Sequence, residues 1–235
     1  MIRPYLALAT DYDGTLAHHG VVSAETLGAV ERLRASGKKL VLVTGRELEE
    51  LKAVFPQIGM CDLVVAENGA LLYWPKTERV KLLAEPPPEK FVQELRERGV
   101  PIAAGRVIVA TIEPHENEVL QTIKALGLEL EVIFNKGAVM VLPTGVNKAT
   151  GLRAGLSILG LSTRHVIGVG DAENDHAFLR ICGCGIAVAN ALPTLKERAD
   201  FITQRSNGEG VIDLIDQLLA NNFELRSART NSAPS

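Results

Sequence analysis

The chain has little net charge, few cysteines and no long apolar run, and each absence removes a class of function. Its 235 residues carry a formal net charge of −3, so it has neither the basic excess of a nucleic-acid-binding protein nor a polybasic membrane patch. No run approaches the ~18 apolar residues that span a bilayer, and no internal repeat is visible. We therefore expect a small-molecule partner, with no nucleic acid and no membrane.

Cysteine occurs only at Cys61, Cys182 and Cys184, an odd number that does not suit a disulfide framework. The first residues lack the apolar segment of a signal peptide, so the sequence predicts a cytoplasmic protein. Cys182 and Cys184 have no matching Cys or His pair to complete a metal site, and they lead into an apolar run. We expect them to be buried as small apolar side chains.

The most informative stretch is an apolar run, residues 5–10, that ends in Asp11, Asp13 and Gly14. It predicts a buried strand of a parallel sheet, and ligands bind beyond the carboxyl ends of such strands. Two carboxylates this close repel each other unless a cation or a shared proton lies between them, and Mg²⁺ suits few carboxylates plus phosphate oxygens. Gly14 allows backbone N–H groups to face a phosphate. The ordinary alternative is an Asp-Gly turn after a strand.

Strand-like and helix-like patterns alternate along most of the chain, which predicts an α/β fold with a doubly wound parallel sheet. Further strands are predicted at 40–43, 63–66, 165–169, 186–188 and 201–202, and helices at 23–36, 48–54, from Asn147 onward and at 211–219.

The pattern changes after Trp74-Pro75. A helix near 89–98, a strand near 107–111, a helix near 116–125 and a hairpin of 130–134 with 138–142 indicate a small inserted α+β unit. The predicted organisation is a core of residues 1–73 and 144–225, a cap at 74–143, and a disordered tail at 226–235.

Several predicted elements bring polar residues to one edge of the sheet. Besides the first pair of acids, these residues are Thr44, Gly45, Arg46, Lys148, Asp171, Asn174 and Asp175. Singly they have ordinary explanations: Thr44 as a strand-end hydroxyl, Arg46 and Lys148 as solvated side chains, and Asp175 as an acid in the first turn of a helix. Their convergence in a parallel-sheet pattern is the stronger signal.

The pattern resembles the haloacid dehalogenase (HAD) superfamily of phosphotransfer enzymes over residues 5–220. Its four motifs appear as 11–15 (Asp-Tyr-Asp-Gly-Thr), 43–46 (Val-Thr-Gly-Arg), Lys148, and 170–175 (Gly-Asp-Ala-Glu-Asn-Asp). The insertion, with residues 67–70 before it, resembles the Cof-like branch with a type-II cap. Because the cap is short, the chain is most similar to archaeal-type phosphoglycolate phosphatases and sucrose-phosphate phosphatases. The resemblance implies a Rossmann-like core.

The resemblance also implies roles. It makes Asp11 the nucleophile that forms an aspartyl-phosphate and Asp13 the general acid and base. Phosphate would be held by Thr44, the Gly45 N–H, Lys148 and Asn174. Mg²⁺ would be held by Asp11, the backbone carbonyl of Asp13, Asp171 and Asp175. Arg46 and Asn68 are candidate substrate contacts.

The resulting expectation is a Mg²⁺-dependent phosphatase for a small phosphomonoester, either phosphoglycolate or a sugar phosphate. A phosphomutase or phosphotransferase would use the same scaffold. A phospho-receiver signalling domain also places Asp, Thr and Lys on a parallel sheet, although 13–15 (Asp-Gly-Thr) and the cap-sized insertion count against it. The pattern does not specify the oligomeric state.

Overall fold

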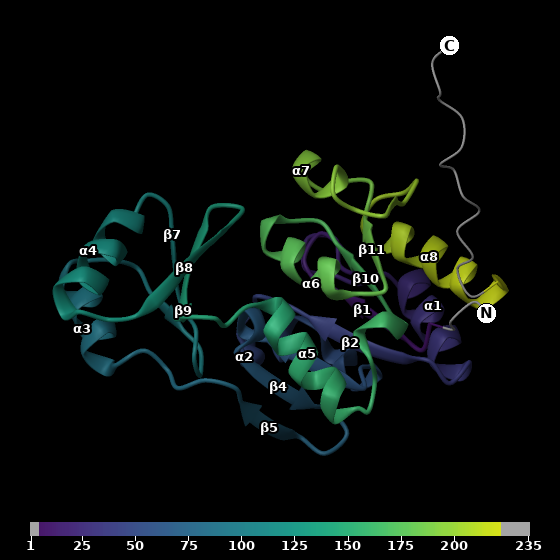
Figure 1. Cartoon of the computed structure of the whole chain (residues 1–235), viewed down its shortest axis with the longest axis horizontal. Coiled ribbons are helices and arrows are strands. Elements are labelled where there is room, and N and C mark those ends of the chain that lie inside the picture. Colours follow the sequence, from purple (N-terminus) through teal and green to yellow (C-terminus); the bar gives the residue numbers. More distant parts are fainter. Residues whose placement is uncertain (1–4, 222–235) are drawn as a thin grey trace, which may run out of the picture.

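The computed structural model describes residues 5–221, so the tail predicted at 226–235 lies outside the described residues. An eight-stranded sheet forms its centre (Figure 1). Its order is β12 (Phe201–Ile202), β11 (Cys184–Ala187), β10 (Val166–Gly170), β1 (Ala7–Thr10), β2 (Lys39–Val43), β3 (Leu63–Ala66), β4 (Leu71–Trp74) and β5 (Arg79–Leu82). The first six strands run parallel, and the pairings of β3 with β4 and of β4 with β5 are antiparallel.

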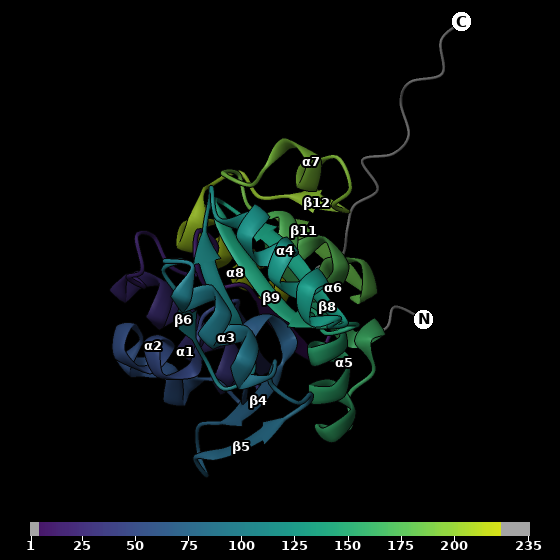
Figure 2. The same ribbon diagram turned by 90° about the vertical axis from the view of Figure 1, so that its left-hand side faces the viewer.

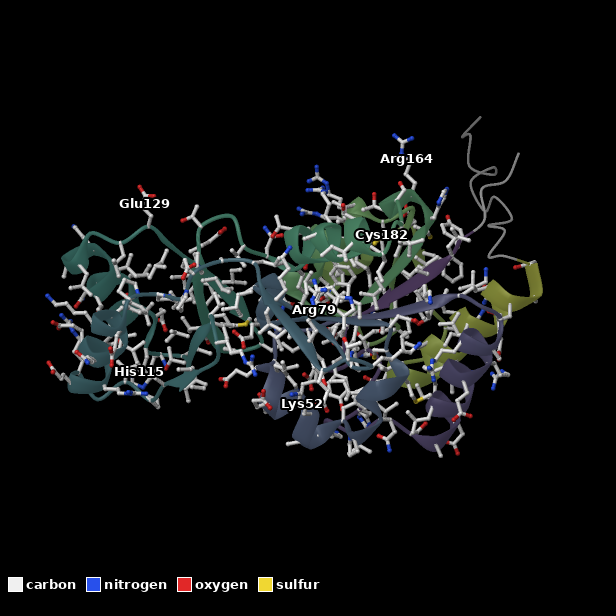
Figure 3. All side chains as sticks on the ribbon, turned by 90° about the horizontal axis from the view of Figure 1, so that it is seen from below. Lys52, Arg79, His115, Glu129, Arg164 and Cys182 are labelled. Carbon is white, nitrogen blue, oxygen red and sulfur yellow. The ribbon has the colours of Figure 1, made fainter. Side chains whose placement is uncertain are left out.

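Helices cover both faces of this sheet, and Figure 3 shows the two groups on opposite sides of the strands. α1 (Ala24–Ala35) packs against α8 (Asn207–Asn221), and α5 (Lys148–Ile158) packs against α6 (His176–Ile181). The remaining core helices are α2 (Leu48–Val54), α7 (Pro193–Lys196) and the short 3₁₀ turns η1 (Pro56–Met60), η2 (Glu67–Gly69), η3 (Thr163–His165) and η4 (Glu173–Asp175). The doubly wound α/β core expected from the sequence is confirmed. No helix within residues 5–221 has the length and apolar character needed to cross a membrane.

Helix caps fix where two of the crossover helices begin. The Ser23 hydroxyl accepts a hydrogen bond from the Thr26 N–H at 3.2 Å and so starts α1. Asn147 accepts from the N–H groups of Ala149 and Thr150, and the Thr150 hydroxyl in turn accepts from the Asn147 N–H. This capping box satisfies otherwise unpaired donors at the start of α5 and fixes the position of Lys148, the first residue of the helix.

The register of the central strands brings their carboxyl ends to one level. Thr10, the last residue of β1, pairs with Leu42 on one side and Val169 on the other. The residues just beyond these strands, beginning with Asp11, Thr44 and Asp171, therefore emerge at the same edge of the sheet. β1 itself is completely buried from Ala7 to Thr10, which makes it a rigid base for the acids beyond it.

A four-stranded antiparallel sheet with two helices on one face forms the inserted unit, which we call the cap (Figure 2). Its strand order is β6 (Ala103–Ala104), β7 (Val109–Ile112), β9 (Ala138–Pro143) and β8 (Leu130–Asn135), and its helices are α3 (Glu89–Glu97) and α4 (Glu116–Leu126). The period-two pattern of β9 divides its side chains between the two faces. Val139 and Val141 join the cluster with Phe91 from α3, whereas Met140 and Leu142 join a cluster with Ala70 of the core.

The division of the chain differs from the expected one at residues 74–82. The expected cap begins at residue 74, but β5 pairs with β4 and extends the large sheet. The Trp74-Pro75 pair suggests a boundary between the two units, but the chain only turns there and adds β5 as the edge strand of the large sheet. β5 is mostly exposed and only four residues long, so its alternation is a weak signal.

Candidate active site

A cavity of about 320 Å³ lies between the carboxyl ends of the core strands and the cap. Its core wall includes Asp11, Asp13, Thr44, Gly45, Arg46, Lys148 and Asn174, and its cap wall includes Ala103, Ile108, Ala110, Asn135, Lys136, Ala138 and Met140. The core wall is thus rich in charge, and the cap wall is mostly small and apolar. The structure brings most of the residues singled out from the sequence to this one cavity.

A buried lysine joins two of the acids. The Lys148 ammonium lies 2.6 Å from Asp11 Oδ1 and 2.6 Å from Asp175 Oδ1, and its side chain is 1% exposed. Burial alone would lower the pKa of Lys148, but the two carboxylates together outweigh this effect and raise that pKa above its ordinary value. Burial raises the pKa of Asp11 to about 7, against the opposing effect of Lys148. The sequence-based alternative of a solvated lysine is therefore wrong.

Asp175 organises the loop after β10. Its Oδ2 accepts hydrogen bonds from the N–H groups of Asp171 and Ala172, at 2.8 and 3.0 Å, while Oδ1 accepts from Lys148. Both oxygens of a fully buried carboxylate thus have partners within the protein. Asp175 fixes the loop that presents Asp171, which is the arrangement expected of a residue that orients a metal ligand.

The oxygens of Asp11, Asp171 and Asp175 form a cluster that suits a hard divalent cation. One carboxylate oxygen from each lies within 4.8 Å of the others, and all three residues are buried. The donors are all oxygens, as Mg²⁺ and Ca²⁺ require. Asp171 lies close to the backbone of Gly14, where a side chain would not fit: a Cβ at Gly14 would lie 2.3 Å from Asp171 Oδ2, and the φ of Gly14 is +84°. The residues present therefore fit a divalent cation.

Asp13 is held by Arg46. The guanidinium Nε and Nη2 atoms lie 2.6 and 2.8 Å from the two carboxylate oxygens of Asp13, and Nη1 pairs with Glu50. The same guanidinium lies 5.7 Å from the centre of the buried Tyr12 ring. Arg46 lines the cavity, but its charge is already used within the protein. No local sequence pattern indicates this pairing with Asp13, and contact between Arg46 and substrate stays a prediction.

Asn174 and Asn68 form a hydrogen-bonded pair. Asn174 Nδ2 donates to Asn68 Oδ1 at 3.1 Å, and Asn174 Oδ1 is buried without a hydrogen-bond partner among the described residues. Asn174 lines the cavity next to Gly45 and Thr44, and Thr44 is held by a hydrogen bond from the Arg46 N–H to its hydroxyl. Asn68 is buried behind this layer with a φ of +55°. It is placed to orient Asn174, and contact between Asn68 and substrate stays a prediction.

Two residues at the site were not recognised from the sequence. Glu67 is fully buried, and its carboxylate accepts hydrogen bonds from the N–H groups of Arg106, Val107 and Ile108, so it connects the core to the β6–β7 loop of the cap. Lys136, in the β8–β9 turn, reaches Asp171 Oδ2 at 2.6 Å. The hairpin predicted from residues 130–134 and 138–142 places Lys136 in its turn, but no sequence pattern indicates that this turn lies close to Asp171.

Comparison with known proteins agrees with this geometry. The family model for haloacid dehalogenase-like hydrolases matches residues 8–119 and 106–215. The chain belongs to this family. This HAD chain is 32% identical over 227 residues to phosphoglycolate phosphatase 2 of Saccharolobus solfataricus, with 93% of this chain and 94% of the relative covered.

Solved structures show the same fold. A Thermoplasma acidophilum protein matches with a TM-score of 0.79 at 17% identity, covering 92% of this chain and 99% of that one. A sugar phosphatase of HAD subclass IIB matches with a TM-score of 0.73 at 20% identity, covering 90% and 98%. The family match makes the chain a haloacid dehalogenase-like hydrolase, and the solved structures show that its fold is shared over nine-tenths of its length.

Proposed function

We propose that the chain is a Mg²⁺-dependent phosphatase that hydrolyses a small phosphomonoester, with phosphoglycolate as the first candidate, through an aspartyl-phosphate on Asp11. The observation that carries the proposal is a convergence of four separate segments: Asp11, Thr44 and Lys148 line one cavity, and Asp171 lies in a carboxylate cluster with Asp11. The name of the Saccharolobus relative supports phosphoglycolate. The cavity volume of about 320 Å³ lies at the small end for ligand sites and so favours a short ester.

Asp11 is suited to attack phosphorus because only one of its oxygens is engaged by Lys148. The ammonium holds Oδ1 at 2.6 Å, which orients the carboxylate and leaves Oδ2 as the oxygen that would attack phosphorus. Formation of the aspartyl-phosphate divides the reaction into two easier steps. Lys148 then stabilises charge on both the nucleophile and the phosphoryl oxygens.

The cation would be held by the Asp11 and Asp171 carboxylates and the Asp13 carbonyl, with Asp175 supporting Asp171 from behind. When bound, it would neutralise negative charge on the phosphoryl group. The protein would contribute the remaining donors, the Thr44 hydroxyl, the Gly45 N–H and the second amide proton of Asn174, since these three residues line the same cavity. These groups would hold the phosphoryl oxygens in line with Asp11.

Asp13 would give a proton to the leaving oxygen and later remove one from water. Its carboxylate is 42% exposed toward the cavity, and both of its oxygens are engaged by Arg46. Arg46 therefore acts as the residue that positions Asp13.

The experiment is a screen of small phosphomonoesters, including 2-phosphoglycolate and several sugar phosphates, with and without Mg²⁺. We expect release of inorganic phosphate that depends on Mg²⁺ and is abolished by EDTA. Transfer of the phosphoryl group to an added sugar in place of phosphate release would favour the phosphotransferase alternative.

The cytoplasm remains the proposed location, in keeping with the free thiols of Cys61, Cys182 and Cys184.

A further inference from the structure

Lys136 lies where the cap meets the acidic cluster of the core. It occupies the turn between β8 and β9, in which Lys136 and Gly137 both have positive φ, at 50° and 81°. Such a two-residue turn connects two antiparallel strands tightly. The tip points toward the loop after β10, and β8 itself contacts the Glu173–Asp175 turn of the core.

The ammonium of Lys136 contacts the same atoms that a divalent cation would use. Nζ lies 2.6 Å from Asp171 Oδ2 and 3.5 Å from the backbone carbonyl oxygen of Asp13. It also lies 2.9 Å from the position that a Cβ on Gly14 would take. A cation bonded to Asp171 and to the Asp13 carbonyl would stand within a few ångströms of this ammonium, where two positive charges in a partly buried site repel each other strongly.

The two lysines at the site differ in how firmly they are held. Lys148 is 1% exposed, belongs to a core helix and has two carboxylate partners. Lys136 is 44% exposed, stands on a turn of the cap, and has Asp171 as the single carboxylate partner recorded within residues 5–221. Lys148 is therefore a fixed part of the site, whereas Lys136 is free to leave it.

We propose that Lys136 is a built-in competitor of the divalent cation: its ammonium occupies the cation position when the cation is absent and must be expelled when the cation binds. The inference rests on the proposed cation site and adds control of its affinity. Because Lys136 belongs to the cap, occupancy of the cation site becomes linked to contact between the β8–β9 turn and the core. Expulsion frees a positive charge at the cavity wall.

The first test measures Mg²⁺ binding by calorimetry to EDTA-treated protein. We expect Lys136→Met to bind Mg²⁺ at least about 5-fold more tightly than the unaltered chain, within the usual range of coupling between sites. Lys136→Arg, which keeps the charge, should bind with nearly unaltered affinity. Lys124→Met, which neutralises an exposed lysine on α4 of the cap, is the matched control and should change nothing. Unchanged or weaker binding by Lys136→Met would overturn the inference.

The second test separates competition for one site from a general effect of charge. Mass spectrometry would follow acylation of Lys136 by an amine reagent in the unaltered chain, with Lys124 as the internal standard. We expect Mg²⁺ to increase labelling of Lys136 several-fold and to leave Lys124 unaffected. Equal labelling with and without Mg²⁺, in a protein that binds Mg²⁺ and turns over substrate, would refute the role of Lys136 alone. Absence of both Mg²⁺ binding and turnover would instead remove the proposed function on which it rests.

Discussion

Replacing Glu67 with alanine should destabilise the protein and release the cap from the core. The carboxylate accepts three backbone hydrogen bonds, from Arg106 at 2.9 Å, Val107 at 2.7 Å and Ile108 at 3.0 Å. Hydrogen bonds to charged groups contribute about 1.5–3 kcal/mol each, and a buried donor left without a partner costs about 1–3 kcal/mol. Since part of the loop would regain water, we expect the free energy of unfolding to fall by about 3–5 kcal/mol.

Two further variants distinguish this connection from an ordinary loss of packing. Glu67→Gln keeps one acceptor oxygen, so its loss should be smaller, about 1–2 kcal/mol. Gly105→Ala leaves Glu67 intact but would place a Cβ 2.7 Å from its carboxylate, and it should weaken the same contact. Urea unfolding would give the free energies, and hydrogen exchange would report the amides of residues 106–108. Unchanged exchange at these amides in Glu67→Ala, with a loss below about 1 kcal/mol, would refute the role of Glu67.

Three further predictions concern the site and the core. Gly14→Ala should reduce turnover by at least about 10-fold in steady-state kinetics. The new Cβ would lie 2.3 Å from Asp171 Oδ2, in a backbone with a φ of +84° that strains any residue other than glycine. Near-normal turnover would contradict this prediction. Lys148→Met should lower the free energy of unfolding by about 3–5 kcal/mol in chemical denaturation, because the buried carboxylates of Asp11 and Asp175 lose the ammonium that pairs with both. A loss below about 1 kcal/mol would show that these ion pairs do not stabilise the fold. Burial raises the pKa of Cys61 to about 12 from an ordinary value of 9.0, so the folded chain keeps its proton while the unfolded chain ionises. The contribution of this thiol to the free energy of unfolding should be fully present below pH 9 and fall by about 1.4 kcal/mol per pH unit as the pH rises toward 12. The free energy of unfolding of Cys61→Ala should therefore depend less on pH in this range than that of the unaltered chain.

The parallel core and the main acids were predictable because their signals are local. Buried strands appear as short apolar runs, and the register of parallel strands places the residues beyond their carboxyl ends at one edge, so Asp11, Thr44 and Asp171 could be brought together without coordinates. The helix starts at Ser23 and Asn147 were also readable, because capping uses residues only two or three positions apart.

The parts that sequence patterns did not provide depend on contacts between distant segments. β5 was missed because a four-residue edge strand buries too little to show a pattern. Nothing in the sequence connects Glu67 to residues 106–108, or Lys136 to Asp171, since these contacts form only when the cap folds onto the core. The pairing of Arg46 with Asp13 likewise spans 33 positions, so no local pattern indicates it.

In the proposed mechanism Asp11 takes the phosphoryl group within a cluster of acids whose mutual repulsion is offset by a divalent cation and Lys148. Its most direct test is phosphate release by purified Asp11→Asn, assayed beside the unaltered chain with the best phosphomonoester from the screen and saturating Mg²⁺. The asparagine is nearly the same size, so the variant should remain folded, but its amide cannot form the aspartyl-phosphate. We expect turnover to fall to the limit of detection, and Mg²⁺-dependent turnover retained by Asp11→Asn would contradict the account.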